Sequence, residues 1–405
     1  RIRDQVLTLV STDPTASPFY DPFRDMPADM PEPLKAELRA AGRAAITDVV
    51  IPAARRYGKF LTEQYLPAGR DTFGTLYEPD GKDFYVNRVK YFTTTDMTPA
   101  EIHRLGLEEV ERIRGEMQAI IDELEFEGDF RAFLDYLRTD PQFYYEDPQD
   151  LLAAYEEAAH KIEPRLDRVF GRLPQIPFEV RPIPDAAAPH TTTAYYARPS
   201  DDGSRPGYYY VNLYKPDSRP KYEIEVLSAH EAVPGHHLEV VLTMELGDLP
   251  KFRRHSYLTA YSEGWALYSE SLGEDLGLYE DPYSKFGALT YDMWRAIRLV
   301  VDTGIHAMGW DRQRAIDFFK ENAAKSELDI TNEIDRYIAW PGQALAYKIG
   351  QMRIQALRAE AEAELGEDFD LRAFHDQLLA HGPVTLHRLE RNTRQWLAAT
   401  RAADQ

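Results

Sequence analysis

Residues 228–239 read Ser-Ala-His-Glu-Ala-Val-Pro-Gly-His-His-Leu-Glu, and they decide how the 405-residue chain is interpreted. The stretch begins like the motif H-E-x-x-H, in which two histidines one helical turn apart hold zinc and the glutamate activates a bound water. Here the second histidine follows later, at His236 or His237. The stretch therefore predicts a zinc site of altered spacing, with Glu231 as the general base.

The spacing from His230 to His236 requires a distorted helix. On a regular helix His236 would lie about 120° round the axis and about 9 Å along it from His230. Two nitrogens that each need a bond of about 2.1 Å to one zinc ion cannot be placed that way. Pro234 has no N–H to offer the carbonyl of His230 and its ring clashes with that carbonyl, so the helix must loosen or bulge. We expect His230 and His236 to converge through a bulged turn, with His237 as the less favoured ligand.

A third ligand is expected from the stretch of residues 261–270, which reads Tyr-Ser-Glu-Gly-Trp-Ala-Leu-Tyr-Ser-Glu. Glu263 completes a His-His-Glu set that leaves a fourth position open for water. Glu270 lies on the same helical face two turns later, where its carboxylate can orient a ligating histidine. An isolated His or Glu is usually an ordinary hydrogen-bonded core residue, but the two motifs together favour a Zn²⁺ site made of His230, His236 and Glu263.

A second group of polar residues occurs on a predicted apolar helix. Arg298, Asp302 and His306 follow at intervals of four residues, which places them on one stripe. One interpretation is a buried ion pair with a hydrogen-bonded histidine. The other is catalytic: Asp302 orients His306, His306 stabilises the oxyanion or shuttles a proton, and Arg298 binds a peptide carboxylate.

Helical periodicity dominates the chain, and strand signals gather in one region. Thr98, Pro99 and Glu101 form an N-cap, a first helical proline and a capping-box glutamate that open a long helix. Three stretches rich in β-branched and aromatic residues, 176–180, 191–197 and 208–213, predict a small antiparallel sheet beside the metal-binding helix. We expect a mostly α protein, with a helical part over residues 1–172 and a catalytic part over residues 173–405 in one bilobed unit.

The composition excludes several classes of protein. The chain has 47 Lys and Arg against 68 Asp and Glu, a formal net charge of −21, and no cysteine. The charge disfavours nucleic acids and anionic membrane surfaces as partners, and disulfides and thiolate metal sites are impossible. No stretch approaches the roughly 18 apolar residues of a membrane span. We expect a soluble protein whose metal is held by histidines and carboxylates.

The beginning of the chain leaves the compartment open. The first residue is Arg1 rather than Met, and residues 1–10 lack the features of a signal peptide. We expect residues to be missing before Arg1, and we favour the cytoplasm over export. The oligomeric state cannot be inferred from these patterns.

Several motifs together resemble known zinc peptidases. Residues 263–266, Glu-Gly-Trp-Ala, are similar to the Glu-Gly-Phe-Ala of aminopeptidase-N-type gluzincins, whose glutamate is a zinc ligand. Residues 230–236 resemble the signature of the thimet oligopeptidase and angiotensin-converting enzyme clan with two residues added, and that of dipeptidyl peptidase III with one added. With residues 299–306, Leu-Val-Val-Asp-Thr-Gly-Ile-His, and 340–347, Trp-Pro-Gly-Gln-Ala-Leu-Ala-Tyr, the chain resembles the bacterial domain-of-unknown-function 885 family, which is regarded as zinc-peptidase-like.

The resemblance implies further site residues. In the gluzincins a tyrosine from a late helix donates a hydrogen bond to the developing oxyanion, which makes Tyr347 the candidate here and Tyr337 the alternative. Zinc peptidases of this type also present an edge strand to the substrate backbone, so an extended peptide is expected to pair with the strands before the metal helix. Tyr195, Tyr196 and Tyr209 would then form subsites.

These observations predict a zinc-dependent metallopeptidase of carboxypeptidase or oligopeptidase type, acting on a peptide or peptide-like substrate. One alternative is a zinc hydrolase of non-peptide amides or esters, which would use the same zinc-water chemistry. The other is a non-catalytic helical binding protein with a structural metal. A closed site with four protein ligands, His237 among them, would favour that last alternative.

Overall fold

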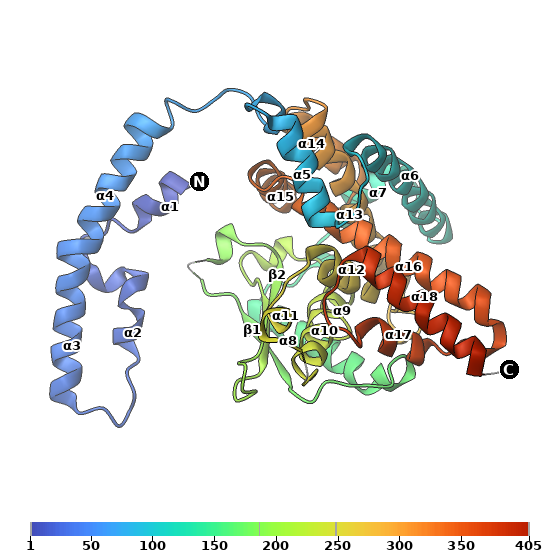
Figure 1. Cartoon of the computed structure of the whole chain (residues 1–405). Helices are drawn as coiled ribbons and strands as arrows, with labels where there is room; N and C mark the ends of the chain where they lie inside the picture. Colours follow the sequence, from blue (N-terminus) through green and yellow to red (C-terminus); the bar gives the residue numbers. More distant parts are fainter. Residues whose placement is uncertain (1, 186, 248, 404–405) are drawn as a thin grey trace. The chain divides into compact units, whose positions relative to one another are not determined.

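The computed structural model describes residues 2–185, 187–247 and 249–403 of the chain. The chain divides into two compact units, residues 1–72 and residues 73–405 (Figure 1). Each unit has a hydrophobic core of its own. The predicted site residues all belong to the second unit.

The first unit is a small helical assembly. Its core gathers round Tyr20, Ile46 and Ile51. The helix that begins after Pro31 continues past Pro52, because a π-helical turn over Ile46–Val50 joins its two segments. The helices of this unit are α1 (Ile2–Thr8), α2 (Asp21–Arg24), α3 (Glu32–Ala45) and α4 (Ile51–Phe60).

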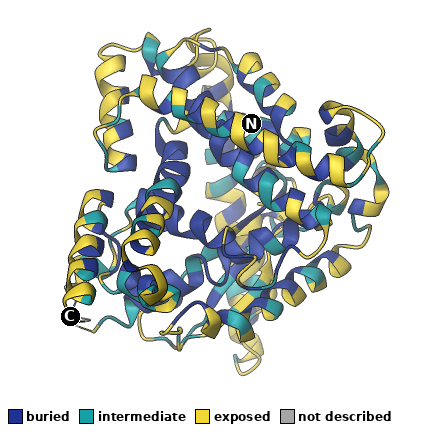
Figure 2. Cartoon of the chain, turned by 90° about the vertical axis from the view of Figure 1, so that its right-hand side faces the viewer, coloured by how far each residue is buried: buried dark blue, intermediate teal, exposed yellow. Residues whose placement is uncertain are grey.

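The second unit is built round the long helix α13, whose residues are buried along almost its whole length. Figure 2 shows the buried residues gathered inside this unit and exposed residues on its outer helices. Helix α6 packs along α13, and α12 packs along α16. The helices are α5 (Gly81–Thr93), α6 (Pro99–Glu123), α7 (Phe130–Thr139), α8 (Pro148–Ile162), α9 (Ile224–Glu231), α10 (His236–Met244), α11 (Lys251–Arg254), α12 (Thr259–Glu270), α13 (Pro282–Ala307), α14 (Arg312–Asn322), α15 (Glu327–Ala339), α16 (Ala346–Leu365), α17 (Leu371–Leu379) and α18 (Leu386–Ala403).

The start of α6 confirms the predicted capping box. The Thr98 hydroxyl accepts from the Glu101 backbone N–H at 3.2 Å, and the Glu101 carboxylate accepts from the Thr98 N–H at 2.8 Å. Two N–H groups that the helix leaves without partners are thereby satisfied. None of the helices in the described residues is long and apolar enough to cross a membrane.

The division between the units does not coincide with the boundary predicted at residue 172. Helices α5 to α8 belong to the second unit, because their apolar faces share one core with α13 and the C-terminal helices. Ile113 on α6 and Leu151 on α8, for example, are fully buried in that core.

The predicted small sheet exists and is mixed instead of purely antiparallel. Its strands are β1 (Phe178–Pro182), β2 (Ala194–Ala197) and β3 (Gly207–Val211), in the order β1-β3-β2. Strand β2 pairs antiparallel with β3, as expected, whereas β1 pairs parallel with β3. The segment between β1 and β2 crosses to the far side of β3, where the Asn212 side chain donates to the Ala188 carbonyl at 2.8 Å. Strand β2 is consequently an edge of the sheet.

The contact between α12 and α16 is made backbone to backbone. A Cβ added at Gly264 would lie 2.5 Å from the Cα of Gly350, closer than any real contact of that kind. The two glycines therefore let α12 and α16 approach each other without an intervening layer of side chains.

We predict that Gly264→Ala lowers the free energy of unfolding by about 1–3 kcal/mol, because the added methyl group must push two packed helices apart. The measurement is denaturant-induced unfolding followed by circular dichroism. Gly115→Ala is the control, since nothing lies within 4 Å of its added Cβ on the exposed side of α6. That change should stabilise the protein by up to about 1 kcal/mol, as expected of Gly→Ala within a helix. Equal effects of the two changes would contradict the packing argument.

Candidate metal centre

The helix carrying His230 ends one residue later, and His236 begins a new one. Ala232 and Gly235 have ψ angles of −109° and −127°, which are not helical. A Cβ at Gly235 would lie 1.8 Å from the His230 carbonyl oxygen, so only glycine fits there. The convergence of the two histidines agrees with the prediction, but the expected bulge within one helix is a full break between α9 and α10.

Helix α12 holds this break in place. The Trp265 indole N–H donates to the Pro234 carbonyl at 2.9 Å, and the Ser269 hydroxyl donates to the same oxygen at 3.3 Å. The carbonyl that the break exposes is thus satisfied by side chains of a neighbouring helix. Because Glu263 is on that helix too, the contact also sets Glu263 against the two histidines.

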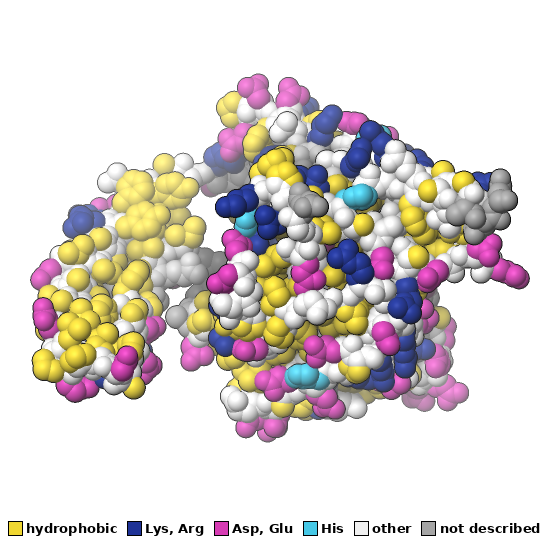
Figure 3. Space-filling view, turned by 60° about the horizontal axis from the view of Figure 1, so that its bottom comes forward, with side chains coloured by type: hydrophobic (Ala, Val, Ile, Leu, Met, Phe, Trp, Pro, Cys, Tyr) yellow, Lys and Arg dark blue, Asp and Glu magenta, His cyan; other side chains and the backbone are white. Residues whose placement is uncertain are grey.

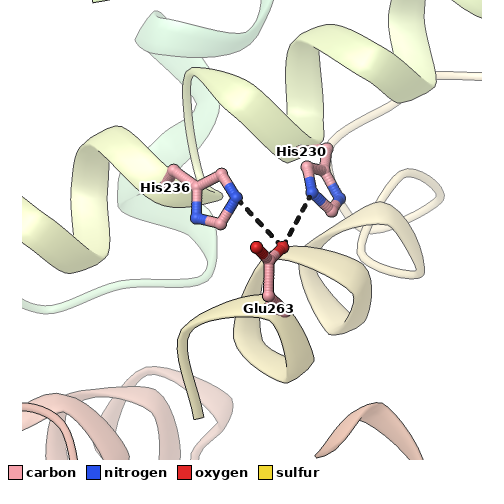
Figure 4. Close-up of side chains that lie close together, drawn as sticks. All are labelled: His230, His236 and Glu263. Atoms are coloured by element: carbon pink, nitrogen blue, oxygen red, sulfur yellow. Dashed lines mark ion pairs between the residues drawn. The ribbon is translucent and has the colours of Figure 1, made fainter. Parts of the chain in front are cut away.

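Three side chains converge on one point (Figure 4). Oε2 of Glu263 lies 3.7 Å from Nε2 of His230 and 3.4 Å from Nε2 of His236. One ligand atom from each of the three residues lies within 4.8 Å of the others. Tetrahedral zinc with bonds of about 2.0–2.1 Å separates its ligands by about 3.4 Å. The observed spacing and the donor types therefore fit such an ion.

The charges in this triad are strongly coupled. Burial opposes ionisation of Glu263, but the neighbouring imidazoles of His236 and His230 bring its pKa well below the usual range. Burial likewise lowers the pKa of His236, whereas the Glu263 carboxylate raises it, to about 9 overall. In the metal-free protein a proton on His236 thus balances the buried carboxylate. A cation bound at the same place would take over that role.

Two outer partners orient the predicted ligands. Nδ1 of His230 donates to Oε1 of Glu270 at 2.7 Å, which turns Nε2 towards Glu263, and this confirms the predicted partner. Oε1 of Glu270 also lies 3.3 Å from Nη2 of Arg295. The Tyr257 hydroxyl donates to Oε1 of Glu263 at 2.6 Å. Sequence reasoning missed Tyr257, because a tyrosine in the loop before α12 carries no motif.

His237 is engaged elsewhere, which decides the alternative left open by the sequence. Its Nε2 donates to the Ile176 carbonyl at 2.9 Å, and its Nδ1 accepts from the Tyr196 hydroxyl at the same distance. Burial lowers the pKa of His237 to about 4, so the ring is neutral. His237 fastens α10 to the sheet and does not face the triad.

The triad lies in the wall of a cavity of about 520 Å³. Residues 192–196, which include most of the edge strand β2, form part of its lining. Glu231 and Tyr347 also line it, and the ring of Tyr347 lies 6.5 Å from that of His230. Of the three tyrosines expected to form subsites, Tyr195 and Tyr196 line the cavity, whereas Tyr209 on β3 is fully buried and is not part of the lining.

The polar stripe on α13 divides between two places. Arg298 lines the cavity, where its guanidinium lies 4.2 Å from the centre of the Tyr347 ring. His306 does not: its Nδ1 accepts from the Thr75 N–H at 3.1 Å and its Nε2 donates to the Tyr337 carbonyl at 3.0 Å. Asp302 accepts from the Tyr85 hydroxyl at 2.6 Å instead of orienting His306. The structure thus does not bring His306 to the predicted site.

Tyr337, the alternative to Tyr347, is buried and lies outside the cavity lining. Its hydroxyl donates to Glu333 at 2.7 Å and accepts from Nε of Arg298 at 2.8 Å. These contacts occupy the oxygen, so Tyr337 positions Arg298. Sequence reasoning also missed Glu333 and Arg336, whose connection to Arg298 spans more than thirty residues and leaves no local signal.

The fold and the site together define a mostly helical protein with a His-His-Glu cluster suited to a metal ion. The model of the family described as bacterial protein of unknown function (DUF885) matches residues 1–392, and the chain belongs to this family. A comparison with curated proteins gives no match.

Two solved structures are similar to the chain. The crystal structure of a protein from Colwellia psychrerythraea, provisionally assigned as a lipoprotein, has 35% identity and a TM-score of 0.94, covering 98% of this chain and 69% of that one. A protein of unknown function from Shewanella oneidensis, with the same provisional assignment, has 20% identity and a TM-score of 0.70, covering 95% and 71% respectively. The second likeness extends to the fold alone.

We predict that the purified protein, after incubation with zinc and desalting, carries about one zinc ion per chain, as in a site of this donor set. Glu263→Ala should lose the ion, since it removes one of three ligands, whereas Glu231→Gln should keep it. Plasma mass spectrometry measures the content. Retention of zinc by Glu263→Ala would contradict the assignment of the ligands.

Loss of the hydrogen bond from His230 to Glu270 should weaken zinc binding less than loss of a ligand does. Glu270→Gln should weaken zinc binding by about 10- to 100-fold, as the loss of such outer partners does in other metal sites. Competition with a chromophoric chelator measures the affinity. Glu274→Gln, an exposed residue shortly after α12, is the matched control and should leave the affinity unchanged.

Proposed function

We propose that the protein is a zinc-dependent metallopeptidase that hydrolyses peptide or peptide-like amide bonds. The observation that carries the proposal is the convergence of His230, His236 and Glu263 in the wall of a cavity that Glu231 also lines. Glu231 makes no hydrogen bond or ion pair with any described residue, and its side chain is nearly buried. An uncommitted carboxylate next to a ligand set is what a general base requires.

His230, His236 and Glu263 would hold the zinc, which would supply a Lewis acid for the scissile carbonyl and for a bound water. Glu231, adjacent to the ligand His230, would take the proton of that water and pass it to the leaving amine. Glu270 keeps Nε2 of His230 free for the metal by accepting the proton of Nδ1.

Tyr347 is the proposed donor to the oxyanion. It lines the cavity, and Gln343 Nε2 donates to its hydroxyl oxygen over 3.4 Å, which leaves the hydroxyl proton available. Burial raises the pKa of Tyr347, so the phenol stays protonated. A protonated phenol near the reacting carbonyl stabilises negative charge as it develops.

The edge strand β2 supports a peptide as the substrate. Residues 192–196 line the cavity, and β2 pairs with β3 on only one side. An extended backbone can add to such an edge by hydrogen bonding, with the alternate side chains of the substrate entering subsites. Tyr195 and Tyr196 are placed to form them.

Two other functions compete with this proposal. A zinc hydrolase of small amides or esters would use the same residues, but the edge strand along the cavity favours an extended substrate. A structural metal site would need four protein ligands. The hydrogen bonds of His237 to Ile176 and Tyr196 argue against that arrangement.

The name of one structural relative bears on the compartment. The protein from Colwellia psychrerythraea, which is 35% identical to this chain, is provisionally assigned as a lipoprotein, a class of exported proteins. This favours export for the present protein over the cytoplasmic location expected from the sequence.

The test of the proposed function is hydrolysis of a mixed peptide pool by the zinc-loaded protein, followed by mass spectrometry. We expect cleavage that a chelator abolishes and zinc restores. Glu231→Gln should lower kcat by about 10²- to 10⁴-fold, because the general base is lost while zinc remains bound. Cleavage of small esters or amides, without cleavage of any peptide, would support the alternative hydrolase.

Tyr347→Phe should lower kcat by about 10²- to 10³-fold, because one donor to the oxyanion is removed. Tyr65→Phe, an exposed position in the first unit, is the control and should leave kcat unchanged. An unaltered kcat in Tyr347→Phe would remove this residue from the mechanism.

A further inference from the structure

The cavity contains more positive charge than the rest of the molecule suggests. The chain carries a net charge of −21, and acidic and basic side chains are interspersed on the face seen in Figure 3. Four arginines nevertheless line the cavity, Arg198, Arg295, Arg298 and Arg336, against three glutamates. Two of those glutamates, Glu231 and Glu263, already have roles in the proposed chemistry. The arginines therefore require an explanation of their own.

Arg298 and Arg336 share a single carboxylate. Oε2 of Glu333 lies 2.9 Å from Nη2 of Arg298 and 3.0 Å from Nη2 of Arg336. The other contacts are neutral: Nε of Arg298 donates to the Tyr337 hydroxyl, and Nη1 of Arg336 donates to the Gln343 side chain. Among the described residues, two guanidinium groups thus face one carboxylate, which leaves one positive charge without a contacting anion.

Both guanidinium groups also retain unused donors. Nη1 of Arg298 and Nε of Arg336 are buried, and neither has a hydrogen-bond partner among the described residues. Arg298 is only 3% exposed, and the rings of Trp294 and Tyr347 hold its guanidinium at 4.6 and 4.2 Å. Buried donors are costly unless a partner arrives, and charged donors bind carboxylates strongly.

We propose that Arg298 and Arg336 bind the terminal carboxylate of the substrate, so that the enzyme removes residues from the C-terminus of peptides. This inference rests on the proposed peptidase function. The two unused donors equal in number the two oxygens of one carboxylate. The single negative charge of that carboxylate would balance the positive charge that Glu333 leaves unpaired. The backbone of an internal peptide segment offers no anion and would leave the charge unbalanced.

The position of the pair relative to the metal centre sets the length of the product. The ring of Tyr347 lies 6.5 Å from that of His230 and 4.2 Å from the Arg298 guanidinium, so the last two groups are at most about 11 Å apart. An extended residue spans about 3.3–3.6 Å. The interval accommodates the one or two residues that follow the scissile bond, and the products are single amino acids or dipeptides.

The test compares two forms of one substrate, an N-acylated tetrapeptide pool that ends in a free carboxylate or in an amide. For the zinc-loaded protein we expect kcat/KM to be at least about 30-fold higher for the free acid, the effect of one buried charged contact. Mass spectrometry should show cleavage one or two residues from the end. Equal rates for the two forms would overturn the proposal.

Variants assign the preference to residues. Arg298→Gln and Arg336→Gln should each lower the ratio of kcat/KM on the free acid to kcat/KM on the amide towards one. Arg336 is the second variant because its side chain is 29% exposed and its loss is less disruptive than that of buried Arg298. Arg312→Gln is the matched control, since its ion pair with Asp335 lies outside the cavity. Persistence of the preference in both folded variants would overturn the proposal.

A binding measurement distinguishes failure of the carboxylate site from failure of the proposed peptidase function. If the protein hydrolyses neither form, the peptidase proposal fails, and calorimetric titration of the zinc-loaded protein with the same two pools then tests the arginine pair alone. Tighter binding of the free acid, lost in Arg336→Gln, would support the carboxylate site. Equal binding of acid and amide would refute it.

Discussion

The site depends on the hydrogen bond from the Trp265 indole to the Pro234 carbonyl. That carbonyl is exposed because the chain leaves the helix after Glu231, and the departure is what allows His230 and His236 to face each other. The helix that supplies the indole also supplies Glu263 and Glu270. This one contact therefore fixes the break between α9 and α10, each of which carries one histidine of the cluster. It also fixes the helix that carries Glu263 and Glu270, the partner that orients His230.

The sequence was most informative where the chemistry is local. The convergence of His230, His236 and Glu263 could be predicted because the two histidines follow each other closely and Glu263 belongs to a second recognisable motif, and Pro234 with Gly235 indicated the distortion. The predominance of helix and the small sheet were predictable from periodicity. The extent of the first unit could not be predicted from periodicity, because α6 has the same amphipathic pattern whether it packs on its neighbours in sequence or on α13.

Long-range pairing explains the remaining differences. The parallel partner of β1 depends on where the segment before β2 crosses the sheet, and strand composition does not specify that path. The stripe of Arg298, Asp302 and His306 was identified as one face, but eight residues of helix rise about 12 Å. Its two ends consequently meet different surroundings: Arg298 meets the cavity, and His306 meets the backbone of Thr75.

The contact between Gly264 and Gly350 has a consequence for redesign. Since the backbones of α12 and α16 touch there, the spacing between the positions of Glu263 and Tyr347 is fixed by main chain and cannot be tuned by choosing larger or smaller side chains. The cavity is also lined by an edge strand whose side chains alternate. If the proposed peptidase function holds, reshaping its range of substrates should therefore begin at Tyr195 and Tyr196, where volume can change while the His-His-Glu cluster keeps its dimensions.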